Sequence, residues 1–282
     1  MAPRAPVQLF CLPYAGASAS LYCKWQPRLP SWIEICPVEL PGHGRNITEA
    51  PLTTVAEMVE RLLPDVQRSV RGPYALFGHS MGAVLAFELA LSLERAAGGD
   101  RGARRASLEP RVVFASGTDA PSRRDPRRYL ALDSDESILA ELQRLAGTPE
   151  AVLADAELME LVLPILRADF AACARYSAER ERRVRCPIEV FGGALDTTTP
   201  EGLEGWREHT SADFALRMFS GGHFFIHEDV DQLLEHIVHR LEGLSAADAS
   251  SSVVGAPLDS ERSGLKRARS LDGSRAGGSA HG

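Results

Sequence analysis

The sequence has few cysteines and no pattern that would organise them. Its five cysteines are an odd number, and none forms a Cys-x-x-Cys pair. A disulfide framework or a cysteine-rich zinc knuckle needs such spacing, so we expect reduced thiols in a cytoplasmic protein. A phosphate-binding loop and a Gly-x-Gly-x-x-Gly motif after a strand are also lacking. The sequence therefore predicts neither a metal nor a cofactor.

Basic residues do not outnumber acidic ones either. The formal net charge is −7, so we expect no nucleic-acid partner. Residues Met1–Phe10 do not contain the apolar core of a secretory signal. The most apolar stretch, Tyr74–Leu93, is interrupted by His79, Ser80 and Glu88. A strand, a tight turn and a buried helix explain it better than a membrane span, and we expect no membrane association.

Short apolar runs alternate with amphipathic segments along most of the chain. Such alternation predicts an α/β fold with a mostly parallel central sheet flanked by helices. The expected strands are Val7–Leu12, Ile33–Leu40, Tyr74–Phe77, Arg111–Ala115, Ile188–Phe191 and Phe214–Phe219. Helical spacing of apolar residues predicts helices over 55–66, Ala83–Arg95 and 230–241.

Two regions depart from this alternation. Asp133–Tyr176 contains consecutive helical patterns with no strand between them, which predicts a helical lid over about 130–176, inserted before the late strands. Residues 245–282 are rich in Ser, Gly and Ala and poor in large apolar residues, so we expect a disordered tail. The predicted organisation is one domain over 1–244 followed by that tail.

One glycine-flanked serine lies between an expected strand and an expected helix. The segment Gly78-His79-Ser80-Met81-Gly82 matches Gly-x-Ser-x-Gly in the context that the motif requires. In this sharp turn the serine Oγ projects above the sheet, and side chains at the two glycine positions would collide. The motif predicts Ser80 as a nucleophile; the alternative is an ordinary glycine-rich turn.

A serine hydroxyl needs an adjacent base to act as a nucleophile. Of eight histidines, His223 follows Gly221-Gly222 directly after the last expected strand. Catalytic groups of parallel sheets gather at the carboxyl ends of strands, so we expect His223 to be the base. His227, four residues further on, is the alternative.

The third member of such a triad is a carboxylate that orients the histidine. Asp196 follows the strand Ile188–Phe191 and gives the chain order Ser, Asp, His of the α/β-hydrolase fold. Asp119, after the strand Arg111–Ala115, is the rival candidate. The oxyanion of the reaction needs backbone N–H donors, which we expect from Met81 and from Ala15, with Tyr14 as the alternative to Ala15.

Several segments together resemble the type II thioesterases that accompany polyketide synthases and non-ribosomal peptide synthetases. The more specific ones are the turn Pro41-Gly42-His43-Gly44-Arg45 and the run Leu163-Pro164-Ile165-Leu166-Arg167-Ala168-Asp169-Phe170, which in that family belongs to the lid. The resemblance covers about residues 7 to 244. It implies hydrolysis of acyl groups from the phosphopantetheine arm of acyl or peptidyl carrier proteins, which clears aberrant or stalled units during polyketide, peptide and antibiotic biosynthesis.

Two other functions fit the same sequence. A serine esterase or lipase acting on small oxygen esters would use the same acyl-enzyme chemistry. A hydrolase fold kept only for binding would be expected to lack a triad residue, whereas all three positions are filled here. For the carrier-protein hypothesis, an acidic partner needs a local basic patch on this acidic chain, and Arg123, Arg124, Arg127 and Arg128 are the candidates; a solvated loop is the alternative.

Overall fold

A six-stranded, fully parallel sheet forms the centre of the molecule. The computed structural model describes residues 6–98, 109–178 and 180–253, and the sheet order is β2-β1-β3-β4-β5-β6. This confirms the predicted α/β fold. The strands are β1 (Val7–Leu12), β2 (Ile33–Pro37), β3 (Tyr74–His79), β4 (Val113–Ser116), β5 (Ile188–Gly193) and β6 (Phe214–Phe219). Only β2 is clearly shorter than expected, since it ends at Pro37 rather than Leu40.

Helices cover both faces of the sheet, because alternate strand residues point to opposite sides. On one face, Phe10 and Leu12 pack in a cluster with α1 (Val55–Ser69) and α2 (Met81–Gly98). On the other face, Leu9 and Cys11 pack with the 3-10 segment η1 (Ala19–Arg28) and with α10 (Val230–Val253). The sheet is therefore buried on both sides, which accounts for the continuous apolar runs in the sequence.

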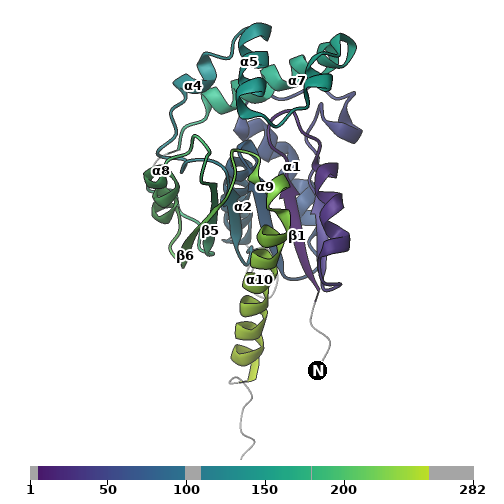
Figure 1. Cartoon of the computed structure of the whole chain (residues 1–282). Coiled ribbons are helices and arrows are strands. Elements are labelled where there is room, and N and C mark those ends of the chain that lie inside the picture. The colour runs from purple at the N-terminus through teal and green to yellow at the C-terminus, as the bar shows by residue number, and fades with distance from the viewer. Residues whose placement is uncertain (1–5, 99–108, 179, 254–282) are drawn as a thin grey trace, which may run out of the picture.

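Further helices lie between β4 and β5, at the end of the molecule opposite to the far end of α10 (Figure 1). They are α4 (Arg127–Leu130), α5 (Asp135–Leu145), α6 (Glu150–Leu153) and α7 (Ala156–Arg175). A small cluster of Ile138, Leu166 and Phe170 packs them together and contacts Ala15 of the loop after β1. The remaining short elements are η2 (Gly44–Asn46), α8 (Pro200–Glu204), η3 (Gly205–His209) and α9 (Phe225–Glu228).

The open edge of the sheet at β2 is covered in part by a side chain. The amide of Gln26 in η1 donates to the Ile33 carbonyl at 2.9 Å and accepts from the Ile35 N–H at 2.8 Å. Pro37, two residues further along the same edge, has no N–H to donate. One carbonyl and one N–H of this edge are thus satisfied within the chain, and a further N–H is missing at Pro37.

The last helix is longer than the sequence pattern suggested. α10 continues to Val253, so the helix extends over the first nine residues of the tail that the sequence predicts. Alanines at 246, 247 and 249 favour helix, and extending an existing helix requires no new nucleation. Residues 254–282, the rest of the predicted tail, lie outside the described residues. No helix in the described part of the chain is long and apolar enough to cross a membrane.

The turn between β3 and α2 depends on two close backbone approaches. Ser80 has a φ of +53°, in the left-handed region that side chains other than glycine rarely occupy. A Cβ atom on Gly78 would lie 2.0 Å from the Gly82 carbonyl oxygen, and a Cβ on Gly82 would lie 2.3 Å from the Leu12 carbonyl oxygen. Both distances are far below van der Waals contact. Both positions of the turn therefore require glycine.

Replacing Gly82 with alanine should destabilise the fold. The new methyl group would push α2 away from the end of β1, and such overpacking against backbone should cost at least about 2 kcal/mol. Urea denaturation followed by circular dichroism would measure this as a lower midpoint. Gly98→Ala at the end of α2 is the matched control, because nothing lies within 4 Å of its Cβ position. An equal midpoint for both variants would contradict the steric account.

Candidate active site

Ser80 lies at the carboxyl end of β3, at the head of α2. Its N–H donates to the Ser116 carbonyl at 2.7 Å, so the last hydrogen bond of the β3–β4 pair holds the start of the turn. The side chain borders a pocket of about 260 Å³. The lining also includes His223, Asp119, Tyr129 and Phe170. The pocket therefore lies between the ends of the strands and the helices that follow β4.

His223 and Asp196 form a close pair beside this pocket. The Nδ1 atom of His223 lies 3.0 Å from Asp196 Oδ2 and 3.1 Å from Oδ1. The His223 side chain is 10% exposed and that of Asp196 is 1% exposed. Burial would raise the pKa of Asp196, but the hydrogen bond with His223 and the Thr197 N–H outweigh it and lower the pKa. A carboxylate at this place favours the Nδ1–H tautomer of the ring, which leaves the Nε2 lone pair free to accept a proton.

Asp119 and His227, the alternatives for the acid and the base, make hydrogen bonds with other groups. Asp119 lines the same pocket, but its Oδ1 accepts a hydrogen bond from the Thr199 N–H at 3.2 Å. Burial raises the pKa of Asp119. His227 in α9 lies 3.1 Å from the hydroxyl of Tyr14 through its Nε2 atom. In the described part of the chain, the histidine that meets Asp196 is His223.

His79 is a part of the site that sequence reasoning did not identify. Its ring is fully buried, and its centroid lies 4.9 Å from that of His223. Nδ1 lies 2.9 Å from Ser116 Oγ. Burial and the nearby His223 and His227 lower the pKa of His79 well below its usual value, so the ring is neutral. It packs against His223 without adding a competing charge, and the Gly-His-Ser order alone carried no signal for this contact.

The backbone groups expected to bind an oxyanion lie on two elements that touch. Met81 opens α2, and Ala15 lies on the loop that follows β1. Ala15 is half-buried between the main core and the cluster around Leu166. The neighbouring Gly16 N–H donates to Asp169 Oδ2 at 2.7 Å. The contact of Gly82 with Leu12 and Pro13 carbonyls places this loop against the head of α2.

The four arginines before α5 do not form a free basic patch. Arg123 pairs with Glu208, Arg127 with Asp125 and Arg128 with Glu141. Arg124 turns inward, where its guanidinium carbon lies 5.1 Å from the ring centroid of Tyr129. The structure therefore does not present these four arginines as an unpaired basic patch: three make ion pairs, and the Arg124 guanidinium group is buried.

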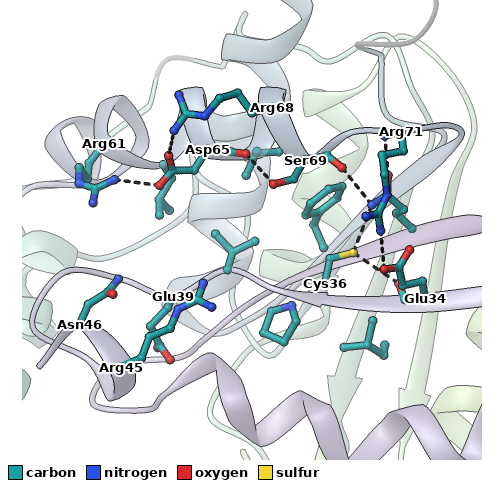
Figure 2. Close-up of a pocket in the computed structure, with 17 residues that line it drawn as sticks. Glu34, Cys36, Glu39, Arg45, Asn46, Arg61, Asp65, Arg68, Ser69 and Arg71 are labelled. Atoms are coloured by element: carbon teal, nitrogen blue, oxygen red, sulfur yellow. Dashed lines mark hydrogen bonds and ion pairs between the residues drawn. The ribbon is translucent and has the colours of Figure 1, made fainter.

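A second cavity, of about 730 Å³, lies beside β2 and α1. Figure 2 shows its charged lining, in which Arg61 and Arg68 pair with Asp65 and Arg71 pairs with Glu34. Burial raises the pKa of the Cys36 thiol there, which disfavours a thiolate. The described residues around this cavity include no nucleophile beside a histidine. Across the described ranges, no group of three or more His, Cys, Asp or Glu is placed to hold a metal ion.

Comparison with known proteins gives a consistent result. The family model for the thioesterase domain matches residues 7–241. Gramicidin S biosynthesis protein GrsT of Aneurinibacillus migulanus is 38% identical over 238 residues, which cover 84% of this chain and 90% of that protein. Thioesterase PikA5 of Streptomyces venezuelae is 37% identical over 243 residues, which cover 84% of this chain and 83% of that protein.

Solved structures show the same likeness in three dimensions. The type II thioesterase BorB from the borrelidin biosynthetic cluster superimposes with a TM-score of 0.73 at 36% identity, covering 85% of this chain and 95% of that one. ClbQ from the colibactin pathway gives a TM-score of 0.76 at 30% identity, and the match covers 86% of this chain and 100% of that one. Since both fold and sequence agree over nearly the whole region from β1 to α10, this chain belongs to the thioesterase domain family and is a thioester hydrolase.

Proposed function

We propose that this chain is a cytoplasmic type II thioesterase that removes acyl groups from the phosphopantetheine arm of carrier proteins, with Ser80, His223 and Asp196 as its catalytic triad. The observation that carries the proposal is the pocket that Ser80 and His223 both line. On the other side of the His223 ring, Nδ1 lies 3.0 Å from Asp196 Oδ2. The similar proteins come from polyketide and non-ribosomal peptide pathways, which supports a carrier-bound substrate. The five cysteines are free thiols, as a reducing compartment requires.

In the first half of the reaction, Ser80 Oγ attacks the thioester carbonyl while His223 Nε2 takes the hydroxyl proton. Asp196 stabilises the resulting imidazolium through Nδ1–H. Within the described residues no hydrogen bond joins Ser80 to His223, and in hydrolases without substrate this contact is often long. The Met81 and Ala15 N–H groups donate hydrogen bonds to the oxyanion of the tetrahedral intermediate. Collapse of this intermediate breaks the C–S bond, and the departing pantetheine thiolate takes the proton from His223.

In the second half, water attacks the acyl-serine ester. His223 accepts a proton from that water and returns it to Ser80 Oγ as the ester bond breaks, which releases the carboxylic acid. The chain thus consumes one water for each thioester and gives a free thiol and an acid. Removing acyl units in this way would free blocked carrier arms in a biosynthetic assembly line.

The pocket next to Ser80 suits a small acyl group better than a long chain. Its volume is about 260 Å³, and its walls come from the helices after β4 as well as from the strand ends. The helices α4 to α6 form no strand pairing with the sheet and, unlike α7, contribute none of the buried residues described for its main core, so they can move without breaking it. This supports a lid over 130–176 that admits the pantetheine arm.

The first prediction concerns the nucleophile and the type of substrate. Ser80→Ala should lower kcat for a short acyl-pantetheine thioester by at least about 1,000-fold, because the covalent step is lost, while the melting temperature stays nearly unchanged. Release of free thiol measures the rate. For wild-type protein, kcat/KM should be higher for the thioester than for the matching oxygen ester and higher again for the carrier-loaded acyl group. A preference for the oxygen ester would point to an esterase.

A second prediction separates the two carboxylates. Asp196→Asn should reduce kcat by about 10,000-fold, because the amide stabilises the wrong histidine tautomer. Asp119→Asn keeps an oxygen acceptor for the Thr199 N–H and should retain most of the activity. Each variant replaces one carboxylate oxygen with an NH2 group, so the two variants serve as controls for each other. The reverse order of losses would transfer the acid role to Asp119.

A further inference from the structure

A buried histidine–carboxylate pair outside the triad joins the helices after β4 to the rest of the domain. His43 lies in the turn after β2, and its Nε2 atom is 2.9 Å from Oδ2 of Asp169 in α7. The two side chains are 1% and 0% exposed, so both are closed to solvent. These residues are 126 positions apart in the chain. The contact is the polar link between the turn and α7.

The surroundings of His43 favour a doubly protonated ring. Its Nδ1 atom lies 2.9 Å from the Pro41 carbonyl oxygen, and Nε2 faces a carboxylate. Both partners accept hydrogen bonds, so both ring nitrogens must donate. Burial works against the charged ring, but the hydrogen bond and charge of Asp169 outweigh it, and the pKa of His43 is raised. The charged groups that face the ring are Asp169 from α7 and Glu39 from the segment after β2.

The same two carboxylates hold the loop after β1. Asp169 Oδ2 accepts the Gly16 N–H at 2.7 Å, while Glu39 accepts the Ala19 N–H at 2.9 Å and the Ser18 hydroxyl at 2.7 Å. Leu166, one turn before Asp169 in α7, also packs on this loop, since a Cβ on Gly16 would lie 2.5 Å from its Cδ2. The position of the loop therefore depends on α7 through a hydrogen bond and an apolar contact.

The Asp169 carboxylate has two hydrogen-bond partners among the described residues, His43 and the Gly16 N–H, and both meet its Oδ2 atom. Its other oxygen, Oδ1, is buried and has no hydrogen-bond partner there. When His43 loses a proton, the neutral ring keeps one N–H and can no longer donate to both the Pro41 carbonyl and Asp169, and the buried carboxylate loses the positive charge beside it. The link between the turn and α7 is then weakened.

We propose that Asp169 and His43 are positioning residues for the hydrolysis: through the Gly16 N–H they hold the preceding residue, Ala15, where its own N–H meets the oxyanion. This inference rests on the proposed function, which assigns Ala15 to the oxyanion site. It gives a functional reason for the contact between the turn Pro41–Arg45 and the α7 segment with Asp169. Neither side chain touches the substrate in this account.

This arrangement predicts that kcat falls at alkaline pH. The pKa of His43 is raised in the folded protein. The contribution of its protonated ring to holding the loop is therefore complete below the ordinary histidine pKa of about 6.5, and it is lost as the pH rises through the raised pKa. The expected result is a fall of kcat on the alkaline side. A group that only stabilised the fold would change the melting temperature without shaping the kcat profile.

The test is steady-state hydrolysis of butyryl-pantetheine by the full chain, with kcat and KM measured across the pH range. Asp169→Ala should lower kcat by about 100-fold with KM within about threefold, because a transition-state contact is lost. Asp169→Asn keeps an oxygen for the Gly16 N–H and should recover part of this loss. His43→Gln supplies an amide donor that does not titrate, so the alkaline fall of kcat should disappear.

Arg167→Gln is the matched control, because Arg167 lies in α7 two residues before Asp169 and makes an exposed ion pair with Asp135. It should keep wild-type kcat. Ser80→Ala is assayed beside the others, so that activity in that variant would reject the proposed function itself. With Ser80→Ala inactive, wild-type kcat in Asp169→Ala, or an unchanged alkaline fall in His43→Gln, would overturn the positioning role. If Asp169→Ala does not fold, Asp169→Asn and His43→Gln decide the question by the same measurements.

Discussion

The close approach of α2 to the end of β1 is the constraint on which the site depends. Gly82 lies against the Leu12 and Pro13 carbonyls, and Gly78 lies against Gly82 across the turn. These contacts leave Ser80 with a positive φ, a strained conformation that the surrounding sheet and helix must maintain. They also fix the distance between Ser80 and the loop after β1. In the proposed site, the nucleophile Ser80 and the oxyanion donor Ala15 come from different elements, and this backbone contact brings the two elements together.

Two histidine–carboxylate pairs in this domain have similar geometry and different surroundings. His223 with Asp196 borders a pocket, so its second ring nitrogen can exchange protons with a substrate. His43 with Asp169 is closed off, and its second nitrogen is committed to the Pro41 carbonyl. In the proposed mechanism the first pair changes its protonation state in each catalytic cycle, whereas the proposed positioning role of the second pair requires that its protonation state stays the same. Access to the reacting atoms, rather than the type of side chain, separates their roles.

Local signals in the sequence predicted the strands and the glycine turn well. Runs such as Val7–Leu12 are apolar because both sheet faces are buried, and the Gly-x-Ser-x-Gly spacing reflects a steric need. Contacts between distant polar residues had no such signal. The packing of His79 against His223 and the link from His43 to Asp169 depend on how elements meet in space, which hydrophobic periodicity does not report. The end of β2 and the length of α10 were misjudged because propensity sets element ends weakly.

The amide of Gln26 has a consequence for how copies of this protein behave at high concentration. An open strand edge is a template on which another chain can add a strand, and such pairing leads to aggregation. Here the Ile33 carbonyl and the Ile35 N–H are already satisfied by a side chain, and the next outward position is Pro37. A foreign strand would have to displace Gln26 and still find no donor at that proline. The chain thus carries its own protection against edge-to-edge association, on the side of the sheet farthest from β6.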